Sequence, residues 1–405
     1  MFSAKEVGLG YFSINSAENV ANTAKVEKIV YSNGMRYVNY NGNWACRWQC
    51  VAALMRSGAV LKVGEIAISG DVPEIFHSYA EDSDSYGESG VIEADKITLG
   101  STQDTGGGWE NQRRPYMWLN RGRRYGTWKS NKMTLHFESK SGTWAIGPGG
   151  LAFSSSCNNN ARYKVASGGA LLNSFGDWTL AAHAKGADKT ALEIESAANL
   201  EINTDHYVTG DPEIDNGATP HTVTINGVIS GGGSLMISGG GRVVFNSFST
   251  PSGWTRVKSG EAVLKAGSRP GNSVLSIWSD GMLTLPDSGT VTLATNIVVT
   301  TNCKLKFIIN DKADTNKLST IAVDHSGIGS DVAPVNVYVE APEEQYMRGF
   351  TPYTLITVTG DTKLATEDLV KFKLQDKPSW AHRLDIVDGN LVLWPSEPGL
   401  SLSVR

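Results

Sequence analysis

Apolar and polar residues alternate with a period of two over most of the chain. From Leu61 onward, segments such as DKITLG, NKMTLHF, GRVVFN and GMLTLP each place two or three apolar residues one position apart. Most of these segments are bounded by Gly, Asn, Asp, Ser or Pro, the residues that favour turns. Alternation of this kind predicts β-strands with one buried face. We therefore expect an all-β protein built from many very short strands.

Pairs of inward positions recur at related spacings along the sequence. The pairs are Leu235/Ile237, Val243/Phe245, Ala262/Leu264, Leu283/Leu285 and Leu391/Leu393. The step from Leu264 to Leu285 is about twenty residues, the length of one coil in a repeat protein made of stacked strands. In such a protein each strand pairs with the strand one coil before it and one coil after it. The spacing predicts a parallel β-solenoid.

Two runs of three glycines, Gly231–Gly233 and Gly239–Gly241, stand close together in the stretch TVTINGVISGGGSLMISGGGRVVF. A phosphate-binding loop would need a strand, a glycine loop and then a helix that carries Lys-Ser or Lys-Thr. Here each glycine run is followed by another alternating segment and by no such lysine. We interpret the glycines as corners, where positive φ angles and close approach of neighbouring coils favour glycine.

The first part of the chain differs from the rest. In NWACRWQCVAALMRSG, apolar residues recur at Trp44, Trp48, Val51 and Met55, and Gly58 follows. This spacing predicts a helix with a glycine stop. The expected division of the chain is an N-terminal cap segment with one helix at 1–70, a parallel β-solenoid at 71–340 and a C-terminal β cap at 341–405.

Composition narrows the class of protein. Of 405 residues, 40% are hydrophobic and 19% are charged, which suits a folded chain, and the net charge of −5 gives no reason to expect nucleic acid or an anionic membrane as partner. No apolar run approaches the ~18 residues of a membrane span. The first residues lack the basic head and apolar stretch of a secretion signal, so we expect a mature form or a fragment. Four cysteines are too few for a disulfide scaffold, and Cys46 and Cys50, four apart, have no further metal ligands nearby.

Several stretches resemble a known family. HTVTINGVISGGGSLMISGGGRVVFN with SGEAVLKAG after it, and GTWAIGPGGLAFSSS before it, resemble the bacterial autotransporter-associated β-strand repeat. The segment FTPYTLITVTGDTKL with WAHRLDIVDGNLVLWP resembles the closing segment of such proteins. The resemblance covers roughly residues 130–395. It implies a right-handed parallel β-helix that is secreted or displayed at a bacterial surface, and it implies no single activity. The predicted fold class is thus an all-β, right-handed parallel β-helix with a small mixed N-terminal cap and a β-rich C-terminal cap.

One stretch is rich in arginine and aromatic residues, WENQRRPYMWLNRGRRYGTW. Its candidate ligand-binding residues are Trp109, Arg113, Arg114, Tyr116, Trp118, Arg121, Arg124, Tyr125 and Trp128. Arginine forks bind carboxylate, sulfate or phosphate, and aromatic faces stack on sugar rings or on the guanidinium groups themselves. Three interpretations remain open: the arginines pack on the aromatics over the first coils, the patch binds an acidic or sulfated polysaccharide, or it binds single-stranded nucleic acid.

Two further features give weaker indications of a metal site or of catalysis. The acidic segment NTDHYVTGDPEIDNGATPH fits no calcium-loop spacing, so we expect a solvated loop and neither a metal nor a cofactor. A polysaccharide lyase needs a base beside a group that neutralises the uronate. Tyr125 beside Arg121 or Arg124 would supply those residue types, although no local motif selects them.

The functional expectation is a secreted or surface-displayed bacterial protein, extracellular or at the cell surface, that acts as a structural, adhesive or glycan-contact module without catalysis. Its expected partner is an acidic polysaccharide or a host or cell-surface glycan, and a monomer is favoured over a trimer. The alternatives are a lyase-like, carbohydrate-active enzyme on acidic polysaccharide and a trimeric phage or fibre structural protein. A groove in which a carboxylate, Tyr or His faces converging arginines would favour the enzyme. Arginines sandwiched between aromatic rings on a flat face would favour the scaffold.

Overall fold

The structure is a computed structural model of the chain, and it is described in two compact units. The described residues are 2–8, 12–14, 23–31, 37–40, 43–46, 52–55, 60–68, 76–77, 91–99, 116–120, 124–129, 132–137, 142–153, 162–165, 169–183, 190–286, 288–310, 316–325, 333–341 and 351–395. The first unit comprises 1–241 and 251–253, and the second comprises 242–250 and 254–405. In both units the described elements are almost all strands, so the all-β prediction is confirmed.

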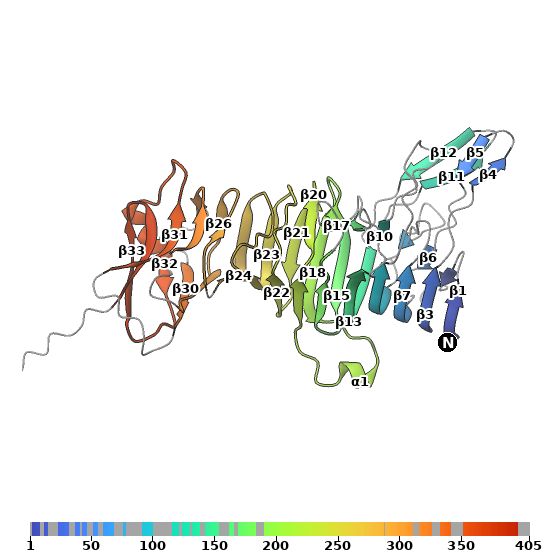
Figure 1. Cartoon of the computed structure of the whole chain (residues 1–405), viewed down its shortest axis with the longest axis horizontal. Helices are drawn as coiled ribbons and strands as arrows, with labels where there is room; N and C mark the ends of the chain where they lie inside the picture. Colours follow the sequence, from blue (N-terminus) through green and yellow to red (C-terminus); the bar gives the residue numbers. More distant parts are fainter. Residues whose placement is uncertain are drawn as a thin grey trace, which may run out of the picture. The chain divides into compact units, whose positions relative to one another are not determined.

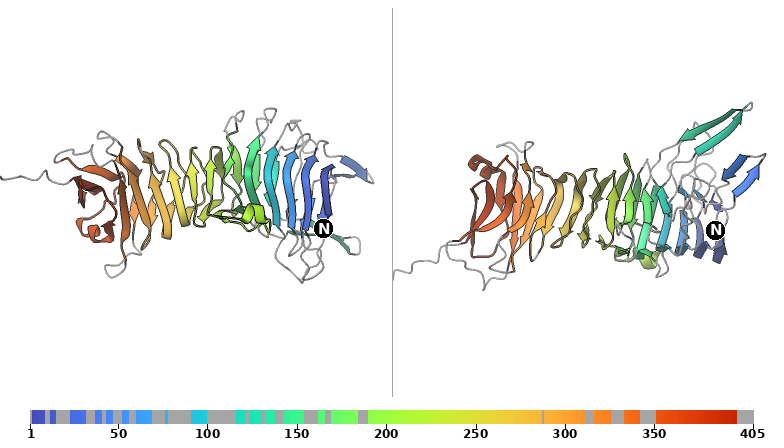
Figure 2. Two further views of the ribbon diagram at one scale, coloured as in Figure 1. Left: turned by 90° about the horizontal axis from the view of Figure 1, so that it is seen from below. Right: turned by 45° about the horizontal axis from the view of Figure 1, so that its top comes forward.

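The first unit contains most of the longer parallel ladders (Figure 1). Its strands in the main sheet are β1 (Phe2–Gly8), β3 (Thr23–Tyr31), β7 (Val60–Ile68), β9 (Val91–Leu99), β13 (Gly142–Phe153), β15 (Ala170–Ser174), β16 (Trp178–Leu180), β18 (Asn199–His206), β19 (Thr222–Ile225) and β21 (Ser234–Ser238). The blue strands of Figure 2 lie side by side in both views and pair in parallel, as in the register Val26↔Val63 and Val63↔Ala94. These three side chains are buried, so each strand adds one member to an apolar row.

The predicted fold class is wrong beyond its all-β part. The main sheet closes as an eight-stranded parallel β-barrel with additional strands, and it is not an open right-handed β-helix. The long strand β13 shows how ladders divide, because it pairs with β9 on one side and with both β15 and β16 on the other. Alternation in the sequence determines which residues face inward. How the ladders divide and close depends instead on the length of particular strands and on their partners.

The mixed N-terminal cap is also corrected. The predicted helix falls on β5 (Asn43–Cys46) and β6 (Ala52–Met55), and residues 47–51 between them lie outside the described residues. Strand β5 forms an antiparallel pair with β4 (Tyr37–Tyr40), and β6 pairs in parallel with β2 (Phe12–Ile14) and β8 (Phe76–His77). Strands β1, β3 and β7 belong to the main sheet, so this part continues the ladder. Pairing with neighbouring strands has overridden a local helical spacing, a common outcome for short apolar runs.

A second set of ladders in the first unit forms a four-stranded parallel sheet. It consists of β10 (Tyr116–Asn120), β14 (Arg162–Val165), β17 (Thr190–Ile194) and β20 (Val228–Gly231). A separate antiparallel pair is formed by β11 (Arg124–Lys129) and β12 (Lys132–Phe137). Between β18 and β19 the chain leaves the sheet for a long excursion that carries the short helix α1 (Pro212–Asp215), visible in Figure 1.

The second unit repeats the parallel arrangement. Its main-sheet strands are β22 (Arg242–Phe245), β23 (Thr255–Leu264), β24 (Leu275–Leu285), β26 (Ile297–Val299), β27 (Lys304–Ile308), β29 (Val323–Asp324), β30 (Val335–Glu340) and β32 (Phe372–Leu374). The inward positions found in the sequence stack in register, Val243 on Ala262 and Ala262 on Leu283, and all three are buried.

A smaller sheet completes the second unit. It contains β25 (Val291–Thr292), β28 (Asn316–Thr320), β31 (Tyr353–Val358), β33 (Ala381–Val387) and β34 (Asn390–Pro395), and the 3-10 helix η2 (Thr366–Lys371) lies between β31 and β32 along the chain. The β33–β34 hairpin is antiparallel and also pairs antiparallel with β31. The predicted three-part division of the chain stays a prediction.

The glycine runs lie where the backbone turns beside another strand. Gly231 has a φ of 107°, and a Cβ there would lie 2.0 Å from the carbonyl oxygen of Ile194. Gly239 has a φ of 91°. Both runs are followed by strands, β21 and β22, as the corner interpretation requires and a phosphate loop does not.

Candidate functional site

The predicted arginine-aromatic patch is divided between two strands. Tyr116 and Trp118 are in β10, and Arg124, Tyr125 and Trp128 are in β11. The other predicted residues, Trp109, Arg113, Arg114 and Arg121, lie outside the described residues. The hairpin β11–β12 and the four-stranded sheet are separate sheets, so no described strand pairing joins the two parts of the patch.

Strand β10 brings its part of the patch beside charged residues that were not predicted. Tyr116 is in register with Arg162 and Trp118 with Lys164. Tyr163, between the two cations, is fully buried, and strand alternation places Arg162 and Lys164 on the opposite face of β14.

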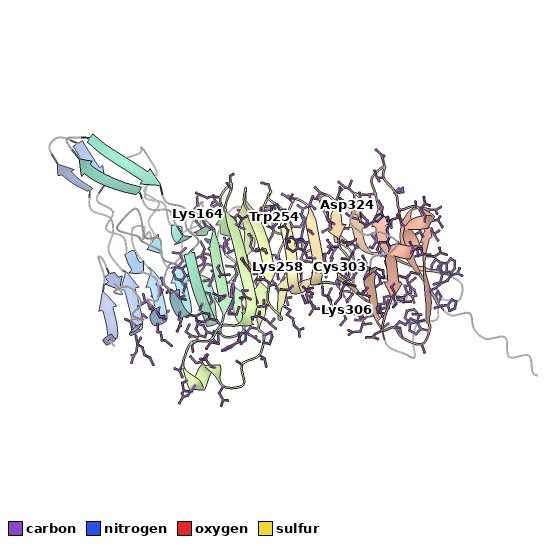
Figure 3. All side chains as sticks on the ribbon, turned by 180° about the vertical axis from the view of Figure 1, so that it is seen from behind. Lys164, Trp254, Lys258, Cys303, Lys306 and Asp324 are labelled. Atoms are coloured by element: carbon purple, nitrogen blue, oxygen red, sulfur yellow. The ribbon has the colours of Figure 1, made fainter. Side chains whose placement is uncertain are left out.

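The two cations on this face are paired to one carboxylate. Arg162 Nη1 lies 3.1 Å from Glu193 Oε2, and Lys164 Nζ lies 3.1 Å from Glu193 Oε1. The Lys164 side chain, labelled in Figure 3, is only 7% exposed and also lies 3.8 Å from Glu195. Pairing of this kind holds neighbouring strands in register and leaves little net charge for a ligand.

A stacked arginine in the second unit combines the same residue types in a fully described site. Arg256 Cζ lies 3.8 Å from the ring centroid of Trp254 and 4.3 Å from that of Trp278. Arg256 follows the buried Thr255 in β23 and precedes the buried Val257, so it faces outward together with the exposed Lys258 (Figure 3). Each cation–π contact is worth about 0.5–2 kcal/mol and holds the guanidinium in place.

The indole rings restrict how Arg256 can meet a ligand. Two rings approach the planar guanidinium within 4.3 Å, so a ligand can reach its N–H groups only where the indoles do not cover it. Its Nε is buried and has no hydrogen-bond partner among the described residues. Burial lowers the pKa of Arg256, but an arginine stays protonated at neutral pH. The N–H edge of the guanidinium is suited to an in-plane carboxylate or sulfate.

A second stacked arginine lies nearby in the chain. Arg269 Cζ is 3.8 Å from the ring centroid of Phe248, which is 48% exposed, and the two residues form a parallel bridge. The Nη2 of Arg269 donates to Asn272 Oδ1. These two stacks are the close ones among the described residues of the second unit, and a third pair, Arg383 over Trp394, is wider at 6.0 Å.

Sequence reasoning missed these stacks for an identifiable reason. Trp254 and Arg256 are two residues apart, which places both on one face of a strand, and Trp278 follows Arg256 by about one coil. Their residues are dispersed between apolar ones, whereas the predicted patch is dense. The signal that finds them is the register of the inward residues, here Val257↔Ile277. Arg256 precedes the first of these and Trp278 follows the second, so the two lie diagonally across neighbouring strands.

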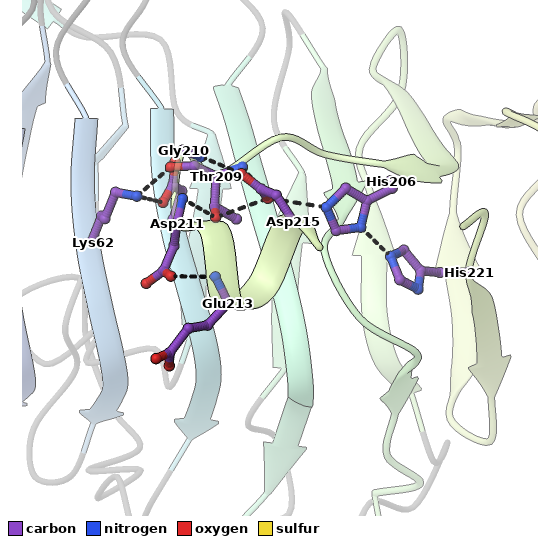
Figure 4. A network of polar contacts seen from close by, with 9 residues as sticks. Lys62, His206, Thr209, Gly210, Asp211, Glu213, Asp215 and His221 are labelled. Atoms are coloured by element: carbon purple, nitrogen blue, oxygen red, sulfur yellow. Dashed lines mark hydrogen bonds and ion pairs between the residues drawn. The ribbon is translucent and has the colours of Figure 1, made fainter. Parts of the chain in front are cut away.

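The excursion between β18 and β19 is organised around a carboxylate, Asp215 (Figure 4). Its Oδ1 accepts hydrogen bonds from the backbone N–H of Thr209 (2.8 Å), the Thr209 hydroxyl (3.0 Å) and His206 Nε2 (3.1 Å), and its Oδ2 accepts from the Gly210 N–H (2.7 Å). Desolvation opposes ionisation, but the hydrogen bonds outweigh it and lower the pKa of Asp215 to about 2. The segment is largely exposed, as expected of a solvated loop, and these hydrogen bonds organise it. Asp211 also caps α1 by accepting from the Glu213 N–H.

The histidine of this network continues it to a second histidine. His206 Nδ1 lies 2.8 Å from His221 Nε2, and His221 Nδ1 lies 3.5 Å from Asp177 Oδ1. The chain of groups therefore runs from one carboxylate through two imidazoles to another carboxylate. Asp177 also accepts a hydrogen bond from the Thr222 N–H at 2.7 Å.

On the other side, the excursion is fastened to the ladder beneath it. Lys62 of β7 donates to the carbonyl oxygen of Thr209 and lies 3.2 Å from Glu93 of β9. Glu93 is 5% exposed, and its burial raises its pKa above the usual range despite Lys62 and a hydrogen bond from Tyr207. Burial and Glu93 together raise the pKa of Tyr207. These polar groups bind one another, so the network fixes the excursion and offers no open reaction centre.

Other predicted chemistry can be placed only in part. No group of three or more His, Cys, Asp or Glu in the described ranges is arranged to hold a metal ion. Of the two closely spaced cysteines, Cys46 is in strand β5 and Cys50 lies outside the described residues. Where the structure is described, it contains no helix with the length and hydrophobicity needed to cross a bilayer.

Comparison with known proteins does not assign this chain to a family. No protein-family model matches the sequence, and no curated protein matches it either. The functional argument therefore rests on the sites themselves, and the resemblance to the autotransporter-associated repeat stays an expectation.

Proposed function

We propose that the protein is a secreted or surface-displayed bacterial module that contacts acidic polysaccharide without catalysis. The observation that carries this proposal is Arg256 held between Trp254 and Trp278 on the outer face of the second unit. A guanidinium fixed by two indoles presents an ordered edge of N–H donors, which matches a carboxylate or sulfate group on a sugar. Lys258 on the same face adds a mobile positive charge.

Two further features support this function. Ladders of paired strands hold the outward residues at fixed spacings, which suits a repeating polymer better than a single small molecule. The resemblance to bacterial surface proteins agrees with a location outside the cell.

The test is affinity electrophoresis of the full chain in gels that contain alginate, dextran sulfate or neutral dextran. We expect retardation by the two acidic polymers alone, and a loss of affinity of at least about tenfold in Arg256→Ala, because one fixed charge-assisted contact is worth about 1.5–3 kcal/mol. Arg256→Lys keeps the charge but loses the planar fork, and it should also bind more weakly.

The matched control is Arg242→Ala, since Arg242 is an exposed cation in the same unit without an aromatic stack. It should retain nearly all binding. Equal losses of affinity in Arg242→Ala and Arg256→Ala would mean that binding depends only on net charge, which contradicts a specific role for Arg256. The absence of retardation by either acidic polymer would refute the proposal. New unsaturated sugar ends in the same gels would refute the absence of catalysis and indicate a lyase.

A further inference from the structure

We propose that the segment 207–221 is a strap over strands β7 and β9, and that protonation of His206 and His221 opens it. The strap is closed in this structure. Its two ends are joined by the contact between His206 and His221, and Asp215 in its middle binds His206. Near its start, Lys62 donates to the carbonyl oxygen of Thr209. The inference does not depend on the proposed glycan contact.

The spacing of the two imidazoles permits only one proton between them. Asp215 is ionised, so His206 Nε2 donates to it, and the Nδ1 of a neutral His206 must accept from His221 Nε2 at 2.8 Å. One added proton fits on His221 Nδ1, which faces Asp177 at 3.5 Å. A second added proton would place two N–H groups against each other. The closed strap therefore excludes the doubly protonated pair.

The direction in which pH changes the stability of the closed strap follows from the same geometry. Burial, together with the neighbouring His206, lowers the pKa of His221, while Asp177 raises it to a smaller extent. A solvated imidazole has a pKa near 6.5, so opening takes up protons below about that pH. The stability of the closed strap is full above about pH 6.5 and declines as the pH falls further. For each proton taken up, the open fraction grows up to about tenfold per pH unit.

The other charged groups around the strap have separate effects. They are Asp177 before β16, Asp205 in β18, Tyr207, Asp211, Glu213 and Asp215 in the strap, Lys62 in β7 and Glu93 in β9. The Asp205 carboxylate is engaged by the Gly240 N–H at 2.6 Å. Glu93 changes the stability of the closed strap with pH in the opposite direction to the histidines. Its pKa is raised in the closed state, so its protonation in acid favours closure.

The experiment is amide hydrogen exchange of the full chain between about pH 7.5 and about pH 5, corrected for the intrinsic pH dependence of exchange. The reporters are the amides of Thr209 and Gly210, which donate to Asp215 in the closed strap. We expect their corrected opening to rise at least tenfold over this range. Peptides from the β33–β34 hairpin serve as the internal reference and should not change.

Variants separate the strap from general acid sensitivity. The double variant His206→Gln/His221→Gln should abolish the pH dependence, and His325→Gln, which removes a histidine of the second unit paired with Asp368, should leave it intact. Asp177→Asn changes a side chain that is 73% exposed, and it should reduce the first proton uptake while the chain stays folded. Opening that is constant with pH in the wild type, or an undiminished slope in the double variant, would overturn the proposal.

Discussion

At the scale of single residues, each stacked or hydrogen-bonded group has its role set by neighbours that are distant in the sequence. Arg256 contacts Trp278, and His206 contacts Asp215 and His221. The same residue types in the predicted patch, dense in the sequence, are divided between two sheets. Chemical identity alone therefore does not distinguish an arginine that binds a ligand from one that packs.

Gly231 gives a residue-scale prediction about the glycine runs. In Gly231→Ala, the new Cβ would lie 2.0 Å from Ile194 O at a φ of 107°, and we expect the free energy of unfolding to fall by about 3 kcal/mol. Gly267→Ala is the control, because φ is 72° there but nothing lies within 4 Å of a Cβ. It should lose only about 1 kcal/mol. Urea unfolding measures both, and equal losses would mean that contact with Ile194 is unimportant.

At the scale of elements, parallel pairing creates rows of charges of alternating sign. Lys28 of β3, Glu65 of β7 and Lys96 of β9 lie in one such row, with Lys28 Nζ 3.0 Å and Lys96 Nζ 3.8 Å from Glu65. Register makes them a ladder that resists slippage of one strand against the next, since a shift of one residue would separate the charges.

The variant Glu65→Gln tests this row of charges, because its effect on the free energy of unfolding should depend on pH. The hydrogen bond from Lys28 is the main reason why the pKa of Glu65 is lowered, although burial opposes it. A carboxylate with a lowered pKa stabilises the fold above its unfolded value, near 4.3, and loses that effect as the pH falls through the folded value. The variant should lose less than about 1 kcal/mol at neutral pH, because the Glu65 side chain is 28% exposed.

The pH dependence of this difference is the sharper measurement. The free energies of unfolding of the wild type and Glu65→Gln should become equal in strong acid, and also at high salt, where the charges are screened. Glu27→Gln provides the control, since Glu27 is an exposed carboxylate next to the same row. A difference that persists unchanged in acid would show that Glu65 acts by packing and not by charge.

At the scale of the whole molecule, buried rows of apolar residues run through each unit, and they enclose a single described thiol. Cys303 is fully buried in the second unit (Figure 3), and burial raises its pKa to about 12. The thiolate is the reactive form, so the native thiol should be inert. This makes Cys303 a reporter of unfolding in the second unit.

The labelling prediction uses a Cys46→Ser/Cys50→Ser/Cys157→Ser chain, in which only Cys303 remains. Its thiol should react at least ~100-fold more slowly in the native protein than in denaturant, because both access and ionisation are suppressed. The onset of labelling should follow the loss of β-sheet circular dichroism in a urea series. Labelling at the unfolded rate under native conditions would mean that the second unit opens readily around Cys303.

The sequence by itself determined the all-β class, the inward positions and the use of the glycine runs at turns. These follow from alternation and from steric limits on φ, which act over a few residues. Rows such as Val243, Ala262 and Leu283 could therefore be anticipated before their register was seen.

Only the tertiary structure decided how the ladders divide and close, that the expected N-terminal helix is strand, and which polar groups meet. The strand β13 has three partners, and the spacing of apolar residues does not encode how many partners a strand takes. Likewise, the excursion and the strands β18, β7 and β9 bring together Asp215, His206, Lys62 and Glu93. Such meetings depend on long-range packing and hydrogen bonding, which can override local propensity and leave no local pattern in the chain.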